Sequence, residues 1–166
     1  MADTQNKPRL RLRPATPDDA RVVFAWANDP GSREASFTTT TIAWDEHRAW
    51  FEAQLERSDR NPLLATLDAK PVAFVRLDAR PGAPDECTIS INVAPAARGR
   101  GLGVASLKAA TRQAARLGFA RIHALIRPEN AASRRAFARA GYVPAGDAAV
   151  AGQAAIVMVC ETAESR

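Results

Sequence analysis

The chain has 166 residues, of which 46% are hydrophobic and 25% charged, with a formal net charge of +5 at pH 7. This composition is typical of one globular domain, and no apolar run approaches the ~18 residues that a membrane-spanning helix needs. The first residues lack the apolar segment of a signal peptide, so we expect a cytoplasmic protein that does not contact a membrane. The basic balance suits an anionic ligand, but no basic run or zinc-finger spacing indicates nucleic acid.

Hydrophobic periodicity and turn residues predict seven strands and four helices in a single domain over residues 9–166, preceded by a flexible tail at 1–8. The loop between the first two helices, residues 28–42, is predicted to be long, polar and irregular, and residues 145–152 are predicted to be a loop as well. The predicted strands cover 9–13, 62–67, 71–77, 88–93, 122–126, a segment that begins at 142, and 154–160; the predicted helices cover 16–27, 44–57, 102–117 and 131–140.

Cysteine and metal chemistry are not expected. Cys87 and Cys160 each lie in a strand-like segment. A cysteine in such a segment is more often a small buried hydrophobic residue than a disulfide partner or a metal ligand. No spacing of ligand-type residues indicates a metal, so the sequence predicts a protein without a metal site.

The segment from Arg98 to Gly103 joins a predicted strand to a predicted helix and reads Arg-Gly-Arg-Gly-Leu-Gly. The first N–H groups of a helix have no partner within the helix, and they lie at the positive end of its dipole. Gly101 and Gly103 carry no Cβ that would keep a ligand away from this backbone. A phosphate or pyrophosphate is therefore the expected guest. The segment lacks the patterns of dinucleotide and Walker-type nucleotide loops.

The R-x-x-G-x-G pattern of Arg98 to Gly103 resembles the pyrophosphate-binding loop of the GNAT superfamily of acetyl-CoA-dependent N-acetyltransferases. The order of the predicted elements is also that of the GNAT fold, and the resemblance covers residues 9–161. It implies an α/β (α+β) fold with a mixed, largely antiparallel twisted sheet of about seven strands, flanked by about four helices, with splayed central strands. A second family segment, N-x-x-[A/S]-x-x-x-[Y/F]-x-x-x-G-[F/Y], is matched by Asn130, Ser133, Phe137, Gly141 and Tyr142.

The resemblance implies that acetyl-CoA is the co-substrate. The backbone N–H near Val93 is then the donor to the thioester carbonyl, and Asn130 bonds the pantetheine, a role compatible with capping a helix. The residues that the resemblance assigns to acetyl-CoA are Asn92, Val93, Arg98, Gly99, Arg100, Gly101, Leu102, Gly103, Asn130 and Ser133.

Attack of an amine on a thioester calls for a base, and for an acid at the leaving thiolate. Phe137 stands where many family members carry a tyrosine that is thought to act as this acid, so Ser133, one turn earlier, is the candidate donor; alternatively no side-chain acid is used, because thiols leave readily near neutral pH. Glu86 and His47 are the candidate bases, although a lone histidine on an apolar helix face is more often a packed core residue. His123 is interpreted as structural or as a surface residue.

The N-terminal half usually sets the acceptor in this superfamily. Here residues 26–29, 33, 36–37 and 42–51 resemble the branch that acetylates nucleotide-linked deoxyamino sugars, as in pseudaminic-acid-type biosynthesis. Arg33 is predicted to pair with a phosphate, and Phe37 and His47 to contact the acceptor. The alternatives are a protein N-terminal acetyltransferase of the ribosomal-protein type and a non-catalytic acyl-CoA-binding module. The expected partners are acetyl-CoA and a small-molecule amine, with no nucleic acid and no membrane; a homodimer is left open.

Overall fold

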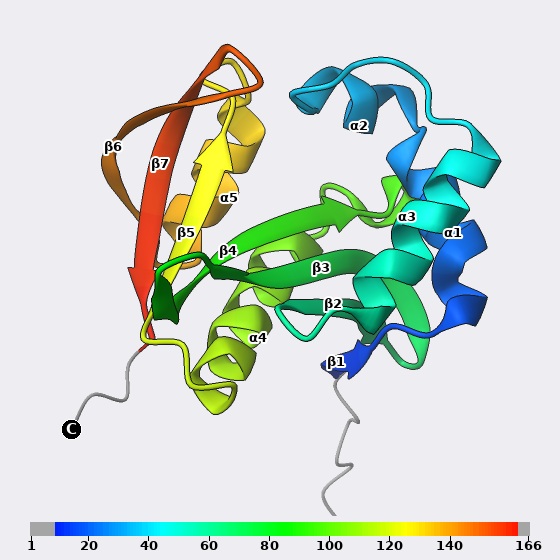
Figure 1. The fold of residues 1–166 in the computed structure, drawn as a ribbon, viewed down its shortest axis with the longest axis horizontal. Coiled ribbons are helices and arrows are strands. Elements are labelled where there is room, and N and C mark those ends of the chain that lie inside the picture. The colour runs from blue at the N-terminus through cyan, green and yellow to red at the C-terminus, as the bar shows by residue number, and fades with distance from the viewer. Residues whose placement is uncertain (1–8, 163–166) are drawn as a thin grey trace, which may run out of the picture.

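The computed structural model describes residues 9–162, so the predicted tail at 1–8 and the last four residues of the predicted domain lie outside the described residues. A seven-stranded sheet with the strand order β1-β2-β3-β4-β5-β7-β6 forms the centre of the fold (Figure 1). The strands are β1 (Leu10–Pro14), β2 (Arg60–Leu67), β3 (Lys70–Arg80), β4 (Ala83–Val93), β5 (Arg121–Ile126), β6 (Val143–Val150) and β7 (Gln153–Glu161). The helices are α1 (Ala20–Ala27), α2 (Pro30–Ala35), α3 (Trp44–Glu56), α4 (Leu102–Arg116) and α5 (Ala131–Arg139), with 3-10 turns at Pro17–Asp19 and Pro95–Ala97.

The two central strands, β4 and β5, are the only parallel neighbours in this sheet, and they pair over a short length. Their pairing runs from Glu86–Arg121 to Ile89–Ala124 and then stops, although both strands continue. Beyond that point β4 keeps its pairing with β3 as far as Val93, while β5 keeps its pairing with β7 as far as Ile126. The strands therefore diverge toward their carboxyl ends (Figure 1), which confirms the predicted splay and the predicted mixed, largely antiparallel sheet.

Successive side chains of the central strands point to opposite faces of the sheet, so the core forms two layers. Val75 and Leu77 of β3 pack with Cys87 and Ile89 of β4 against Leu107 of α4. The opposite face of the sheet buries Leu64 and Phe74 against α1 and α3, through residues that include Val23, Trp26 and Phe51. Cys87 and Cys160 are free and buried, as expected. Helix α3 packs mainly against β2, and Figure 1 shows no helix of the described residues over β3 and β4 between α3 and β5. Arg76 and Asp78 of β3 lie on this face of the sheet.

The predicted irregular loop at 28–42 contains a helix, and this part of the prediction was wrong. Asp29 caps α2 by accepting a hydrogen bond from the Ser32 N–H at 3.3 Å, and Pro30 occupies the first helical position. An Asp-Pro pair can end one helix and also start the next, because the aspartate caps the new helix and the proline fits its first position. Residues 9–162 thus form the four expected helices and the additional six-residue helix α2.

Three strands, β3, β4 and β6, are several residues longer than predicted. β6 continues to Val150 through the predicted loop, and a two-residue turn at Ala151 and Gly152 joins it to β7. Both turn residues have positive φ, 50° and 76°, as a tight hairpin requires. Likewise the predicted connection between the strands at 71–77 and 88–93 shrinks to Pro81 and Gly82, which places Arg80 and Glu86 within β3 and β4.

Candidate active site

The glycine-rich loop leads into α4 with its backbone exposed. Gly99 and Gly101 both have φ of +73°, a region that favours glycine, and no atom lies within 4 Å of the position that a Cβ would occupy on either residue. Gly101 is the N-cap of α4, and no side chain among residues 9–162 caps this helix end. The first N–H groups of α4 are therefore available to an anion at the positive end of the helix dipole.

The end of β4 presents a backbone donor on its unpaired side. The Ala94 N–H donates to the Val72 carbonyl at 2.8 Å, so it points toward β3. Successive N–H groups of an extended strand point to opposite sides, and the Val93 N–H thus points toward the gap left by β5. The Val93 side chain lies on the α4 side, where its Cγ2 is 3.4 Å from the position of a Cβ built on Gly103. This geometry supports an oxyanion-donor role for the Val93 N–H.

Helix α2 lies beside the open end of the splay and is bonded to both the loop and β4. The Arg98 Nη1 is 2.7 Å from Asp29 Oδ2, and its Nη2 donates to Ser32 Oγ at 2.8 Å. Ser32 Oγ in turn donates to Asn92 Oδ1 at 3.0 Å. Gly31 leaves room for this contact, since a Cβ there would lie 2.9 Å from Arg98 Nη1. In this structure the Arg98 and Asn92 side chains, both predicted to contact acetyl-CoA, fix α2. Arg100 is exposed and Leu102 is buried against the core.

The segment after α2 crosses to the far side of the splay. Arg127, which follows β5, donates to the carbonyls of Glu34 and Ser36 at 2.6 and 3.0 Å. Gln153 of β7 donates to the carbonyl of Phe37 at 2.8 Å, and Phe37 itself is half-buried. Residues 29–37 therefore connect the two diverging halves of the sheet.

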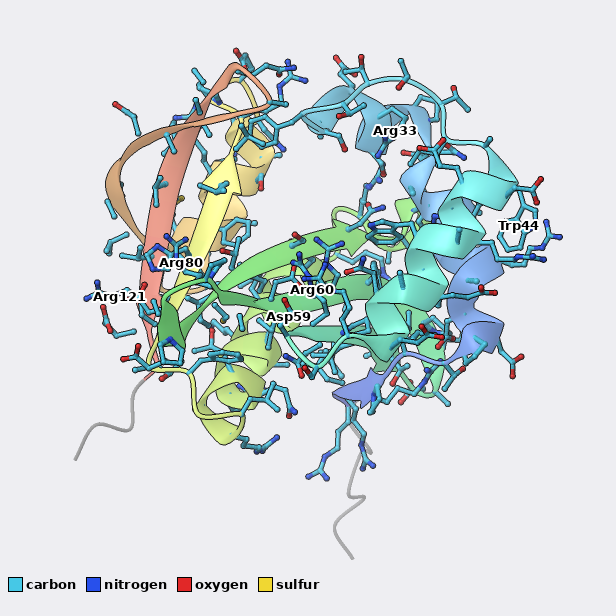
Figure 2. All side chains as sticks on the ribbon, viewed as in Figure 1. Arg33, Trp44, Asp59, Arg60, Arg80 and Arg121 are labelled. Carbon is cyan, nitrogen blue, oxygen red and sulfur yellow. The ribbon has the colours of Figure 1, made fainter. Side chains whose placement is uncertain are left out.

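Arg33, a predicted phosphate ligand, forms its hydrogen bonds with residues 27–40 of its own segment. Its Nε donates to the Ala27 carbonyl at 2.6 Å, and its Nη1 donates to the carbonyls of Thr38 and Thr40 at 3.0 and 3.4 Å. Its Nη2 donates to Ser36 Oγ at 3.2 Å. Figure 2 shows Arg33 pointing from α2 toward the interior of this segment. The geometry makes Arg33 an organiser of residues 36–40 rather than a free anion ligand.

Helix α5 contributes one polar side chain at its start and an apolar one further along. Asn130 Oδ1 accepts from the Ser133 N–H at 3.1 Å, so Asn130 caps α5 and has its Nδ2 left to bind a ligand. Ser133 is half-buried in the first turn. Phe137 is 4% exposed and its ring meets the Tyr142 ring edge-on at 4.9 Å. Burial also raises the pKa of Tyr142, and neither ring is placed to deliver a proton to the open side.

His47, predicted as base and acceptor contact, is a core residue in this structure. It is 2% exposed, and its Nε2 lies 3.1 Å from the Ala20 carbonyl, which joins α3 to α1. Its ring contacts the rings of Phe24, Trp44, Trp50 and Phe51, at centroid distances of 5.3–6.1 Å. Burial lowers the pKa of His47 and favours the neutral ring. The structure does not bring His47 to the splay.

Glu86, the other candidate base, lies beside His123. Its Oε2 is 2.6 Å from His123 Nε2, and Arg80 Nε is 3.7 Å from the same oxygen. The contact follows from the parallel register, in which His123 pairs with Thr88 on β4 just before the strands diverge. The sequence interpretation missed His123, because the register of two strands separated by a helix is not visible in their own residues.

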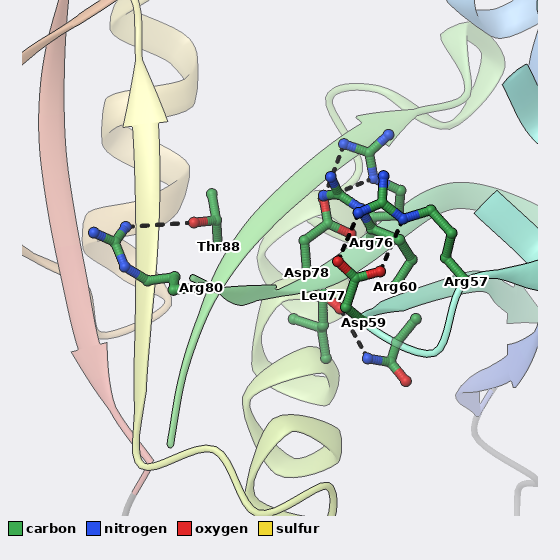
Figure 3. Close-up of polar contacts among 9 residues, drawn as sticks. Arg57, Asp59, Arg60, Arg76, Leu77, Asp78, Arg80 and Thr88 are labelled. Atoms are coloured by element: carbon green, nitrogen blue, oxygen red, sulfur yellow. Dashed lines mark hydrogen bonds and ion pairs between the residues drawn. The ribbon is translucent and has the colours of Figure 1, made fainter. Parts of the chain in front are cut away.

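A cluster of arginines covers the polar face of β2 and β3 (Figures 2 and 3). Arg60 Nη1 and Arg76 Nη2 lie 2.5 and 3.0 Å from the same oxygen, Oδ2 of Asp78. Arg57 pairs separately with Asp59 at 2.7 Å. The sequence interpretation also missed this cluster, although the alternation Arg76-Leu77-Asp78-Ala79-Arg80 places three charges on one strand face.

These features fit acetyl-CoA at the splay. The uncapped α4 N-terminus offers backbone donors for a pyrophosphate, and the unpaired β4 edge offers the Val93 N–H. Within residues 9–162 there is no group of three or more His, Cys, Asp or Glu residues that could hold a metal ion. None of the helices in this part of the chain is long and apolar enough to cross a membrane.

Comparison with known families decides the classification. The profile of the acetyltransferase (GNAT) domain matches residues 9–143. The chain belongs to the GNAT acetyltransferase family. This membership confirms the acetyl-CoA-dependent N-acetyltransferase class that the loop and the second family segment predicted. A search of curated protein sequences gives no match.

Solved structures agree with the GNAT fold. Aminoglycoside acetyltransferase AAC(6′)-Ib, bound to ribostamycin and coenzyme A, has a TM-score of 0.83 at 19% identity over 92% of this chain and 93% of that chain. A putative phosphinothricin N-acetyltransferase has a TM-score of 0.77 at 24% identity, over 94% and 100% of the two chains. The putative acetyltransferase yncA from Salmonella typhimurium, with acetyl-CoA, has a TM-score of 0.74 at 22% identity over 93% and 95%.

Proposed function

We propose that this GNAT protein acetylates the primary amine of a small anionic molecule, with a nucleotide-linked deoxyamino sugar as the first candidate. The observation that carries the proposal is the divergence of β4 and β5 after Ile89 and Ala124, beside the uncapped start of α4. The open edge of β4 leads directly onto the arginine-covered face of β3, where an acceptor would approach.

Acetyl-CoA supplies the acetyl group as a thioester. The residues proposed to hold it are the backbone of Gly99 to Gly103 for the pyrophosphate and Asn130 for the pantetheine, and the Val93 N–H donates to the carbonyl oxygen that gains charge during attack. Asn92 and Arg98 position α2 at the same end of the site. Proximity of the amine to the carbonyl provides much of the rate enhancement in such a two-substrate reaction.

Proton transfer is assigned to groups on the polar side of the splay. Glu86 with His123 is proposed to receive the ammonium proton through a chain of water molecules along the polar face, because His123 lies one residue before the last β4–β5 pair and bonds Glu86. Ser133 at the start of α5 is proposed as the hydroxyl that assists the leaving thiolate. Phe137 has no proton to give, and Tyr142 is buried.

The experiment is an acetyl-transfer assay in which thiol release is followed by mass analysis of the product. The acceptor panel contains a UDP-linked 4-amino-4,6-dideoxy sugar, ribosomal-protein N-terminal peptides, ribostamycin and phosphinothricin. Turnover with the nucleotide sugar alone supports the proposal. Turnover confined to peptides assigns the protein to the N-terminal acetyltransferases instead, and tight acetyl-CoA binding without turnover on the whole panel favours the non-catalytic module. Light scattering on the same preparation tests whether the protein forms a homodimer.

A further inference from the structure

We infer that Arg60 and Arg76 form a subsite for an anionic group of the acceptor, a phosphate or a carboxylate, on the polar face of β2 and β3. This inference rests on the proposed function, because it assumes that the acceptor approaches the open edge of β4 over this face. The inference names the residues that would recognise the acceptor, and it specifies that the acceptor carries a negative charge.

The first observation is an imbalance of charge. Both guanidinium groups contact a single oxygen, Asp78 Oδ2, with Arg60 Nη1 at 2.5 Å and Arg76 at 3.0 Å from Nη2 and 3.1 Å from Nε. The neighbouring carboxylate of Asp59 is already engaged by two nitrogens of Arg57. Two cations therefore share one carboxylate, although their side chains are only 28% and 19% exposed. Like charges held this close and partly shielded from water are unfavourable unless another anion joins them.

The environment of Arg76 shows the same imbalance. Burial lowers the pKa of Arg76, and the positive charge of Arg60 lowers it further, against the opposing effect of Asp78. A second anion beside the two arginines would offset both effects by favouring the charged form of Arg76. Arginine is suited to that role because its planar set of donors binds phosphate or carboxylate through two hydrogen bonds.

The second observation is an unused donor. Arg60 Nε is buried and has no hydrogen-bond partner among residues 9–162. Asp78 Oδ1 is also without a partner in this part of the chain, so the carboxylate does not satisfy that donor. The Asp78 side chain is 7% exposed. Buried polar atoms of folded proteins are nearly always bonded, and an acceptor oxygen from a ligand would complete the hydrogen bonding of Arg60.

The third observation is position. Arg76 pairs with Ser90 of β4, two residues from the Phe74–Asn92 pair and on the same face, about 7 Å along the strand from Asn92. A small acceptor bound here would thus place its amine near the Val93 N–H with its anionic group a few bonds away. Trp50 of α3 stands over Arg76, with the guanidinium 5.1 Å from the ring centroid, and is 38% exposed. Its ring offers an apolar wall to the same ligand.

The anion has two chemical sources, and the experiment separates them. In a nucleotide-linked amino sugar it is the diphosphate, and in an amino acid it is the carboxylate. Two matched pairs of ligands isolate the charge: the 1-diphosphate of a 4-amino-4,6-dideoxy sugar against the methyl glycoside of the same amino sugar, and an L-amino acid against its amide. Calorimetry measures the binding of each ligand to the full chain in saturating coenzyme A, so that the ligand does not occupy the pyrophosphate loop.

The wild-type protein is expected to bind the anionic member of at least one pair about tenfold to a hundredfold more tightly than its neutral partner. Arg60→Gln and Arg76→Gln should each reduce that ratio severalfold or more, and the double variant should abolish it. Each single variant leaves Asp78 paired with the remaining arginine, so the fold is expected to persist. Arg112→Gln, an exposed arginine on α4 across the sheet, is the matched control and should leave the ratio unchanged.

Equal affinity for both members of both pairs, or a charge preference that survives in the double variant, overturns the subsite. Failure of the proposed function looks different. A protein that shows the arginine-dependent preference but transfers no acetyl group retains the subsite and loses the enzymatic proposal. One that transfers acetyl groups without any charge preference retains the enzymatic proposal and loses the subsite.

Discussion

Glu86 of β4 and His123 of β5 lie on adjacent parallel strands, with 2.6 Å between Glu86 Oε2 and His123 Nε2. His123 is 13% exposed and Glu86 25%, so the pair is partly shielded from water. Glu86 begins the pairing of β4 and β5 opposite Arg121, and His123 lies one residue before that pairing ends, on the face that carries Arg76 and Asp78. A carboxylate that holds a histidine in one orientation is a common arrangement for moving protons.

We expect Glu86→Gln and His123→Gln each to lower kcat about tenfold to a hundredfold, because a positioned base contributes on that order or more. The dissociation constant of acetyl-CoA should not change, since neither residue lies at the pyrophosphate loop. Glu161→Gln is a suitable control, because it removes an exposed ion pair with Arg121 from the same end of the sheet. If both variants keep the wild-type kcat and lose only thermal stability, the pair is structural.

His47→Ala should reduce stability rather than catalysis. The change removes a buried ring that packs among four aromatic rings and bonds the Ala20 carbonyl, and it should cost about 2–4 kcal/mol in the free energy of unfolding. Denaturant unfolding measures that loss, and kcat at a temperature where the variant is folded should stay within about twofold of wild type. A folded variant with abolished turnover would restore the catalytic hypothesis for His47.

The same histidine predicts a pH dependence of stability. Burial lowers the pKa of His47 in the folded protein, so the unfolded chain binds its proton more readily. The contribution of His47 is therefore fully present above its usual value of 6.5 and is lost as the pH falls from there toward the lowered folded-state pKa. Unfolding measured from pH 8 to pH 5 should show a shallower acidic decline in His47→Gln than in the wild type. Parallel curves would contradict this assignment.

Phe137→Tyr should not improve the enzyme, although it restores the residue common in the family. Phe137 is 4% exposed and packs edge-on against Tyr142, so the new hydroxyl would be buried and would cost about 1–3 kcal/mol if it found no partner. Thermal unfolding and kcat measured together check this. A rise in kcat in Phe137→Tyr would show that the ring reaches the thiolate and that the leaving group lacks an acid in the wild type.

The strand, loop and helix around Gly101 were predictable from the sequence because the glycines of the loop and the patterns of the flanking elements are local features. The positive φ angles of Gly99 and Gly101 agree with that prediction. Helix α2 was missed because the segment Asn28-Asp29-Pro30-Gly31 both ends α1 and starts α2. Its asparagine, proline and glycine are more strongly typical of a helix end than of a helix start. The start of β6 was predicted, but its continuation through residues 145–150 was missed because these exposed, alanine-rich residues show no alternation, and pairing with β7 decides their conformation. The contacts of His123, Arg60 and Arg76 depend on strand register, which is a tertiary property.

The most direct test of the account is calorimetric binding of acetyl-CoA to wild type, Gly101→Asp and Gly82→Asp. Gly101 and Gly82 have φ of +73° and +75°, and neither has an atom near the position of a Cβ, so the two substitutions impose similar strain and the same added charge. Only Gly101 caps α4, where a carboxylate would repel the pyrophosphate. We predict that Gly101→Asp loses acetyl-CoA binding by at least about a hundredfold while Gly82→Asp binds as the wild type does. Acetyl-CoA affinity that survives in a folded Gly101→Asp protein would contradict the placement of the co-substrate at this loop.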